Sequence, residues 1–284
     1  MRIPVLCLAR VLFVVASPAL YAGCERNDAN KSDPQQTATS KHQQVVPESC
    51  DFGNVNDAAR PAHTAAILLD QSGSNEASID ARCNEVGVEV AGLLKTLRNK
   101  FDLYLLVAAT GKRTSPQIIL DLTRVPTRID LDVDDPLTSI EVIERKEEAL
   151  WQQHVARVSQ CVISRCRATT TSNSNILDLT QSAIEQARAV CKANASNCQK
   201  VLVSIHSDLA DPEAFASGAK ARVKKLTSGF NNLEVVACGT HQVKSATPNQ
   251  QRHFANAWKR LFEDNIQILP MCPGSQLATT GRST

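Results

Sequence analysis

A regular alternation of short aliphatic runs with stretches of helical periodicity most constrains what this chain can fold into. Residues 65–69 form a continuous run, Ala-Ala-Ile-Leu-Leu, which ends at Asp70 as expected for a strand buried on both faces. Residues 78–98 follow with apolar side chains at the three- and four-residue spacing of a helix. Comparable aliphatic runs lie at 103–107, 118–120, 201–205, 233–237 and 266–269, and further helical patterns lie at 138–160, 175–193 and 254–262. The alternation predicts an α/β fold with helices packed on a central sheet.

The connections between the predicted strands determine how this sheet is arranged. Only a short turn that contains Gly111 separates 103–107 from 118–120, so these two strands should pair antiparallel. The other strands are joined through helices and should be parallel. We therefore expect a doubly wound, mostly parallel sheet of the Rossmann type, with one antiparallel edge strand and helices on both faces. Ligands of such sheets bind at the carboxyl ends of the strands, so the residues just after each strand carry the functional information.

The N-terminal residues 1–23 have the composition of an export signal. Two arginines precede an apolar centre at 11–16, which is far shorter than the roughly 20 residues that span a bilayer. Residues 21–24, Tyr-Ala-Gly-Cys, resemble a bacterial lipobox, in which the thiol of Cys24 receives a diacylglycerol. The alternative is ordinary secretion with cleavage near Ala22. The lipobox interpretation predicts attachment to a membrane through the lipid and a location in the bacterial cell envelope.

The rest of the chain divides by composition. Residues 24–49 are polar and have little to bury, which predicts a disordered tether, and 274–284 look like a flexible tail. The folded domain then covers 50–273, with 123–170 as an insertion. A net charge of +2 argues against a nucleic-acid partner.

Eight cysteines lie in the predicted folded domain, an even number that suits disulfides in an oxidising compartment. Closeness in sequence suggests Cys161 with Cys166 and Cys191 with Cys198. Two late strands precede Cys238 and Cys272, which could meet at one sheet edge, and Cys50 and Cys83 would pair by elimination.

Zinc and calcium sites find little support in residue spacing. No Cys-x-x-Cys pair occurs, and the histidines, His206 among them, show no ligand spacing. Three aspartates and a glutamate match the oxygen positions of a calcium loop, but Asp135 stands where that loop needs glycine, and Thr138 with Glu141 equally forms a helix cap. The loop aspartates are Asp130, Asp132 and Asp134. We do not expect calcium there.

A better candidate for a metal site follows the first strand. Asp70, Ser72 and Ser74 offer a carboxylate and two hydroxyls at alternate positions on a sharp turn. Such oxygens suit a hard cation, Mg²⁺ or Mn²⁺, which keeps open or water-filled positions. The alternative is that the two serines only cap the following helix while the carboxylate binds backbone amides.

Residues 62–273 resemble the von Willebrand factor A (vWA) family, which places Asp-x-Ser-x-Ser after its first strand as part of a metal-ion-dependent adhesion site. The family adds an Asp after a later buried strand, matched here by Asp208, and a Thr before a helix. Ser174 would replace that Thr, and Thr170 and Thr171 are nearby alternatives. The glycines usual in that loop are missing.

The resemblance implies a binding module rather than an enzyme. In this family an acidic side chain of a protein partner fills the open position of the cation. Two alternatives stay open: an envelope enzyme that uses the cation as a Lewis acid, and a degenerate domain with a structural role only. The chain has no Gly-x-Ser-x-Gly elbow around Ser72 and no identifiable general base.

Overall fold

The computed structural model describes residues 50, 52, 62–71, 78–110, 116–129, 131, 139–168, 175–193, 198–239, 247–270 and 272, the side chains of 193, 198 and 199 aside. The predicted signal, the tether with Cys24, the calcium-loop aspartates and the tail lie outside these residues. Within them, no helix is long and apolar enough to cross a membrane.

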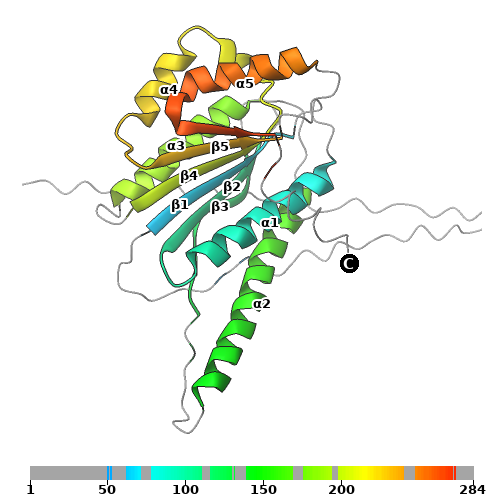
Figure 1. Ribbon diagram of the computed structural model, residues 1–284, viewed down its shortest axis with the longest axis vertical. Helices are drawn as coiled ribbons and strands as arrows, with labels where there is room; N and C mark the ends of the chain where they lie inside the picture. Colours follow the sequence, from blue (N-terminus) through cyan, green and yellow to red (C-terminus); the bar gives the residue numbers. More distant parts are fainter. Residues whose placement is uncertain are drawn as a thin grey trace, which may run out of the picture. The chain divides into compact units, whose positions relative to one another are not determined.

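Strands and helices alternate along the described chain as the sequence predicts (Figure 1). Two short 3₁₀ helices lie at Pro212–Phe215 and Glu263–Asn265. The main elements are β1 (Ala62–Leu69), α1 (Ile79–Leu97), β2 (Asp102–Ala109), β3 (Gln117–Val125), α2 (Ile140–Arg167), α3 (Ile176–Ala193), β4 (Cys198–His206), α4 (Ala219–Thr227), β5 (Leu233–Cys238), α5 (Pro248–Phe262) and β6 (Ile266–Leu269).

The six strands form one sheet in the order β3-β2-β1-β4-β5-β6. All neighbouring pairs are parallel except β2 with β3, which are antiparallel. The predicted antiparallel edge strand is therefore confirmed, and β1 and β4 are direct neighbours in the sheet. Leu69 pairs with both Ala109 and His206, so the carboxyl ends of the three central strands lie level with one another.

Helices cover both faces of the sheet, because successive side chains of the buried strands point to opposite sides. On one face Ile67 and Leu69 pack with α1 and α2 in a core that includes Trp151. On the other face Ala66 and Leu68 pack with α3, α4 and α5. Figure 1 shows the two helical layers with the sheet between them. The predicted doubly wound α/β fold is confirmed.

Helix α2 belongs to the predicted insertion and is longer than the predicted 138–160. Its residues before Trp151 are exposed or half-buried, and burial begins at that tryptophan. The buried half lies so close to α1 that a Cβ on Gly87 would come within 2.5 Å of Ile163. The Ser159 hydroxyl donates to the Gly87 carbonyl at 2.9 Å in the same contact.

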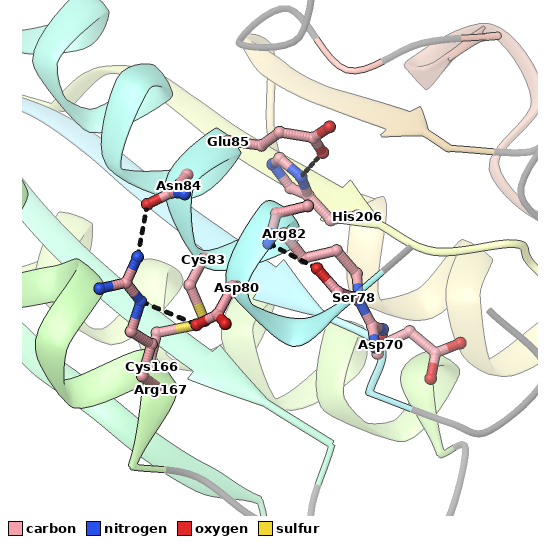
Figure 2. Close-up of a disulfide and its surroundings, with 11 residues drawn as sticks. Asp70, Ser78, Asp80, Arg82, Cys83, Asn84, Glu85, Cys166, Arg167 and His206 are labelled. Carbon is pink, nitrogen blue, oxygen red and sulfur yellow. Dashed lines mark hydrogen bonds and ion pairs between the residues drawn. A yellow bond between two sulfur atoms is a disulfide. The ribbon is translucent and has the colours of Figure 1, made fainter. Parts of the chain in front are cut away.

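Two of the four predicted disulfides are wrong. Cys50 is bonded to Cys161 instead of Cys83. Cys83 is bonded to Cys166 instead of Cys50 (Figure 2). The reason is that α2 continues to Arg167, so Cys161 and Cys166 stand on one helix. Five residues turn a helix by roughly 140° beyond a full turn, which points the two side chains apart. Each instead joins α2 to a different segment of the chain.

The predicted Cys238–Cys272 bridge is confirmed, with a Cα–Cα distance of 4.8 Å. Cys191 is also disulfide-bonded. The side chain of its predicted partner Cys198 is outside the described part, so that pairing stays a prediction.

Candidate functional site

The carboxyl ends of β1 and β4 bring two buried aspartates to the same edge of the sheet. Asp70 follows β1 and is 0% exposed, and Asp208 follows β4 and is 1% exposed. The strand ladder extends into this edge, since the Asp70 amide donates to the His206 carbonyl at 2.9 Å and the Thr110 amide donates to the Leu69 carbonyl at 2.9 Å. The position predicted for the metal site is therefore formed by the ends of the central strands.

A serine hydroxyl links the two aspartate-bearing loops. Ser207 Oγ donates to Asp70 Oδ2 at 2.8 Å and accepts from the Leu209 amide at 2.9 Å. The sequence analysis did not identify Ser207 as a site residue. Its hydroxyl therefore orients the Asp70 carboxylate.

Only one of the two carboxylate oxygens of Asp208 takes part in a hydrogen bond among the described residues. Oδ1 accepts from the Ala210 amide at 2.9 Å, whereas Oδ2 is buried and has no hydrogen-bond partner among the described residues. Buried carboxylate oxygens are rarely left unpaired, and an unpaired one calls for a water, an ion or another ligand. The next residue, Leu209, has φ 62°, a left-handed conformation that costs a non-glycine residue about 1 kcal/mol or more and clusters at functional sites.

Asp211 ties the start of α3 to the same loop. Its Oδ2 accepts from the Leu177 amide at 2.8 Å, and its Oδ1 accepts from the Glu213 amide at 2.9 Å. Burial raises the pKa of the Asp211 carboxyl, and the nearby charge of Asp70 raises it further. The first turn of α3 is thus fixed beside the site. Ser174, the predicted replacement for the Thr of the vWA family, lies three positions before Leu177 but outside the described residues.

The other predicted loop ligands, Ser72 and Ser74, also lie outside the described residues, as do Thr170 and Thr171. The structure does assign the cap of α1. Ser78 is its N-cap, and the Ser78 hydroxyl accepts from the Ala81 amide at 3.2 Å. The alternative in which Ser72 or Ser74 caps this helix is therefore wrong, because the cap is a later residue.

Arg82 on α1 is a site residue that sequence reasoning missed. It is 6% exposed, and its Nη1 donates to the backbone carbonyl of Asp70 (Figure 2). Burial lowers the pKa of the guanidinium, and the carboxylates of Asp70, Asp208 and Glu85 oppose that effect. An arginine stays protonated in proteins, so a fixed positive charge stands beside the two aspartates.

A buried ion pair lies at the end of β4, two residues before Asp208. His206 is 2% exposed, and its Nε2 is 2.6 Å from Oε2 of Glu89 on α1. Burial alone would lower the pKa of His206, but Glu89 and Glu85 raise it to about 9. Burial alone would raise the pKa of Glu89, and His206 reverses that shift and lowers it. The pair therefore carries both charges at neutral pH.

The described donors fit a hard divalent cation. Two buried carboxylates face one edge of the sheet, one of them with an unpaired oxygen, and no sulfur or imidazole ligand is needed for such an ion. Arg82 counts in the opposite direction, because its charge competes with a metal for the same carboxylates.

Comparisons with known proteins give likenesses to solved structures only. No family model and no curated protein matches the chain. Manganese-loaded TRAP protein of Plasmodium vivax is 15% identical, with a TM-score of 0.39 over 78% of this chain and 72% of that one. Pilus adhesin SpaC of Lactobacillus rhamnosus GG is 12% identical, with a TM-score of 0.43 over 81% of this chain and 30% of that one. Proximal thread matrix protein 1 of the mussel byssus is 7% identical, with a TM-score of 0.43 over 78% and 46%.

This chain thus spans less than half the length of two of these proteins. The fold assignment rests on the sheet itself: five parallel strands, one antiparallel edge strand beside β2, and helices on both faces. The described residues have the doubly wound, mostly parallel α/β fold that the resemblance to the vWA family implies.

Proposed function

We propose that this protein is a metal-dependent protein-binding module, an adhesion or scaffold domain of the bacterial cell envelope. The observation that carries the proposal is the buried, unpaired Oδ2 of Asp208 beside Asp70, at the ends of two adjacent parallel strands. A divalent cation such as Mg²⁺ or Mn²⁺ would satisfy that oxygen and neutralise both carboxylates. The residues that would hold it are Asp70, Asp208, Ser72, Ser74 and Ser174, or Thr171 in place of the last.

Partner binding follows from the chemistry of this ligand set. Serine and threonine hydroxyls are uncharged, so they leave more positive charge on the cation than carboxylates in their places would, and an open position of the cation can still bind an acidic side chain of a protein partner. Ser207 would keep the Asp70 carboxylate oriented, and Asp211 would keep the start of α3 in place. Lipid on Cys24 would attach the domain to a membrane.

Calorimetric titration with Mg²⁺ and with Mn²⁺ tests the proposal directly. The parent protein should bind one ion, and Asp70→Ala should lose binding while its far-ultraviolet circular dichroism stays close to the parent's. Asp80→Asn is a matched control, because Asp80 is an exposed α1 carboxylate that pairs with Arg167 at 3.0 Å, outside the cluster formed by Asp70, Asp208 and Asp211. Absence of binding to the parent at millimolar metal would refute the proposal. Capture of envelope proteins with Mg²⁺ but not with chelator then tests partner binding.

A second candidate, a metal-free structural domain, is favoured by Arg82. Its buried guanidinium already supplies a positive charge to Asp70 and Asp208. Arg82→Gln separates the two functions. If the site binds metal, removing a competing charge should tighten Mg²⁺ binding. If the guanidinium takes the place of a metal, the variant should lose stability, and neither protein should bind Mg²⁺.

A further inference from the structure

A second set of metal-binding atoms meets at the ends of β4, β5 and β6. A ring nitrogen of His206 and the sulfur atoms of Cys238 and Cys272 all lie within 4.8 Å of one another. His206 and Cys238 are direct neighbours in the parallel pairing of β4 with β5. All three residues are buried, and in this structure the two cysteines are joined as a disulfide.

The imidazole of His206 is held as histidine ligands of metals usually are. Such histidines donate one ring N–H to a carboxylate or carbonyl, which fixes the ring and leaves the other nitrogen for the ion. Here Nε2 is 2.6 Å from Glu89, while Nδ1 is buried and has no hydrogen-bond partner among the described residues. Glu85 Oε2 is 3.9 Å from Nδ1, too far for a hydrogen bond but close enough to share an ion (Figure 2). Nδ1 is therefore the nitrogen available to a metal.

We propose that reduction of the Cys238–Cys272 disulfide converts this corner into a site for a thiophilic divalent cation of the Zn²⁺ class. The ligands are the two cysteine thiolates and Nδ1 of His206, with the Glu85 carboxylate or a water in fourth place. This ligand set suits Zn²⁺, whereas the all-oxygen site beside it suits Mg²⁺ or Mn²⁺. Two different cations would thus bind at one edge of the sheet, and only the thiolate site depends on reduction.

The step balances with a dithiol as reductant. Its two thiols are oxidised to a disulfide, and the Cys238–Cys272 bond is replaced by two cysteine thiols. Zn²⁺ then displaces both thiol protons and the proton on Nδ1, which pass to solvent. Zinc lies about 2.3 Å from sulfur and about 2.0–2.1 Å from nitrogen in such sites, so ligand atoms within 4.8 Å need only small side-chain rotations.

Co²⁺ is the probe for the test, because cobalt bound by thiolates gives intense charge-transfer absorption that oxygen ligands do not. The full chain, reduced with a phosphine that does not itself supply thiols, should bind one Co²⁺ with this absorption, and Zn²⁺ should displace it. The oxidised chain should not show it. Glu89→Gln should weaken binding about 10–100-fold, as loss of such a carboxylate partner does elsewhere.

Three variants keep the proposal falsifiable. Cys238→Ser with Cys272→Ser should abolish the absorption, whereas Cys50→Ala with Cys161→Ala, which also removes two thiols, should retain it. Asp70→Ala should retain it too, so failure of the oxygen site and failure of this site are distinguishable. Alkylation mapping adds a residue-level readout: Zn²⁺ should protect Cys238 and Cys272 alone. Absorption that persists without these two cysteines, or no absorption in the reduced parent, would overturn the proposal.

Discussion

Removal of the Cys83–Cys166 bridge should lower the free energy of unfolding of the domain, and the size of the loss depends on the length of the loop that the bridge closes. The two cysteines are 83 residues apart in sequence, and a loop of that length corresponds to about 4.5 kcal/mol of lost unfolded-state entropy. The Cys50–Cys161 bridge already shortens the path, through 50–83 and 161–166, to roughly 38 residues, which reduces the figure to about 4 kcal/mol. Both side chains are 0% exposed, so alanine is the appropriate replacement.

The assay compares the parent with the double variant Cys83→Ala, Cys166→Ala. Both are unfolded in urea without reductant, and circular dichroism monitors the unfolding. A loss of about 4 kcal/mol corresponds to a melting temperature lower by about 8–16 °C for a domain of this size. The pairing expected from sequence makes a different prediction, since a five-residue loop closed by Cys161 and Cys166 would contribute only about 2 kcal/mol. A loss below about 1 kcal/mol, or peptides that link Cys161 to Cys166 in the parent, would refute the reasoning.

Three further predictions concern packing, pH and anchoring. Gly87→Ala should destabilise the domain by about 1–3 kcal/mol, because the new methyl group meets Ile163. Gly92→Ala on the same helix has open space around its methyl group and should stabilise the domain by about 0.5–1 kcal/mol. The midpoints of urea unfolding of the two variants and the parent test both expectations. Burial lowers the pKa of His154 in the folded state from 6.5, so its contribution to stability is complete above 6.5 and is lost as the pH falls from 6.5 through the lowered folded-state pKa. His154→Gln should therefore flatten the acid limb of the stability curve, and an unchanged limb contradicts the assignment. Cys24→Ala should abolish labelling with radioactive palmitate. Equal labelling of the variant and the parent would reject the lipid anchor.

The sheet could be predicted because its strands have a distinctive sequence. A continuous aliphatic run such as 65–69 fits only a strand buried on both faces, and helical connections then require parallel neighbours. Helix α2 was harder to delimit, because residues 140–150 face solvent and give no apolar stripe. The expected pairing of Cys161 with Cys166 fails for a related reason: their closeness in sequence indicates a short loop, whereas α2 continues to Arg167.

The candidate site could be predicted only where its residues directly follow strands. Asp70 and Asp208 could be found in this way, and both are buried at the predicted edge. Arg82 and Glu89 lie on α1, and only tertiary packing brings them to this edge. A usable signal was present: Arg82 stands one helical turn before Val86, and Glu89 lies between Val86 and Val90, two valines that are fully buried. Charged residues interleaved with a buried helical stripe indicate buried hydrogen bonds or ion pairs, because a buried charge is costly without such a partner.

The balance of buried charge at the strand ends favours a divalent cation over Arg82 alone. Asp70, Asp208 and Asp211 are at most 1% exposed, whereas Arg82 supplies one positive charge, which acts on Asp70 and Asp208, and His206 is already paired with Glu89. Two negative charges are left uncompensated if all three aspartates are ionised. Burial penalises such an excess severely. Burial is also the main cause of the raised pKa of Asp211, and the charge of Asp70 adds a smaller shift in the same direction. One divalent cation would cancel the excess, whereas the guanidinium can cancel only a part of the carboxylate charge.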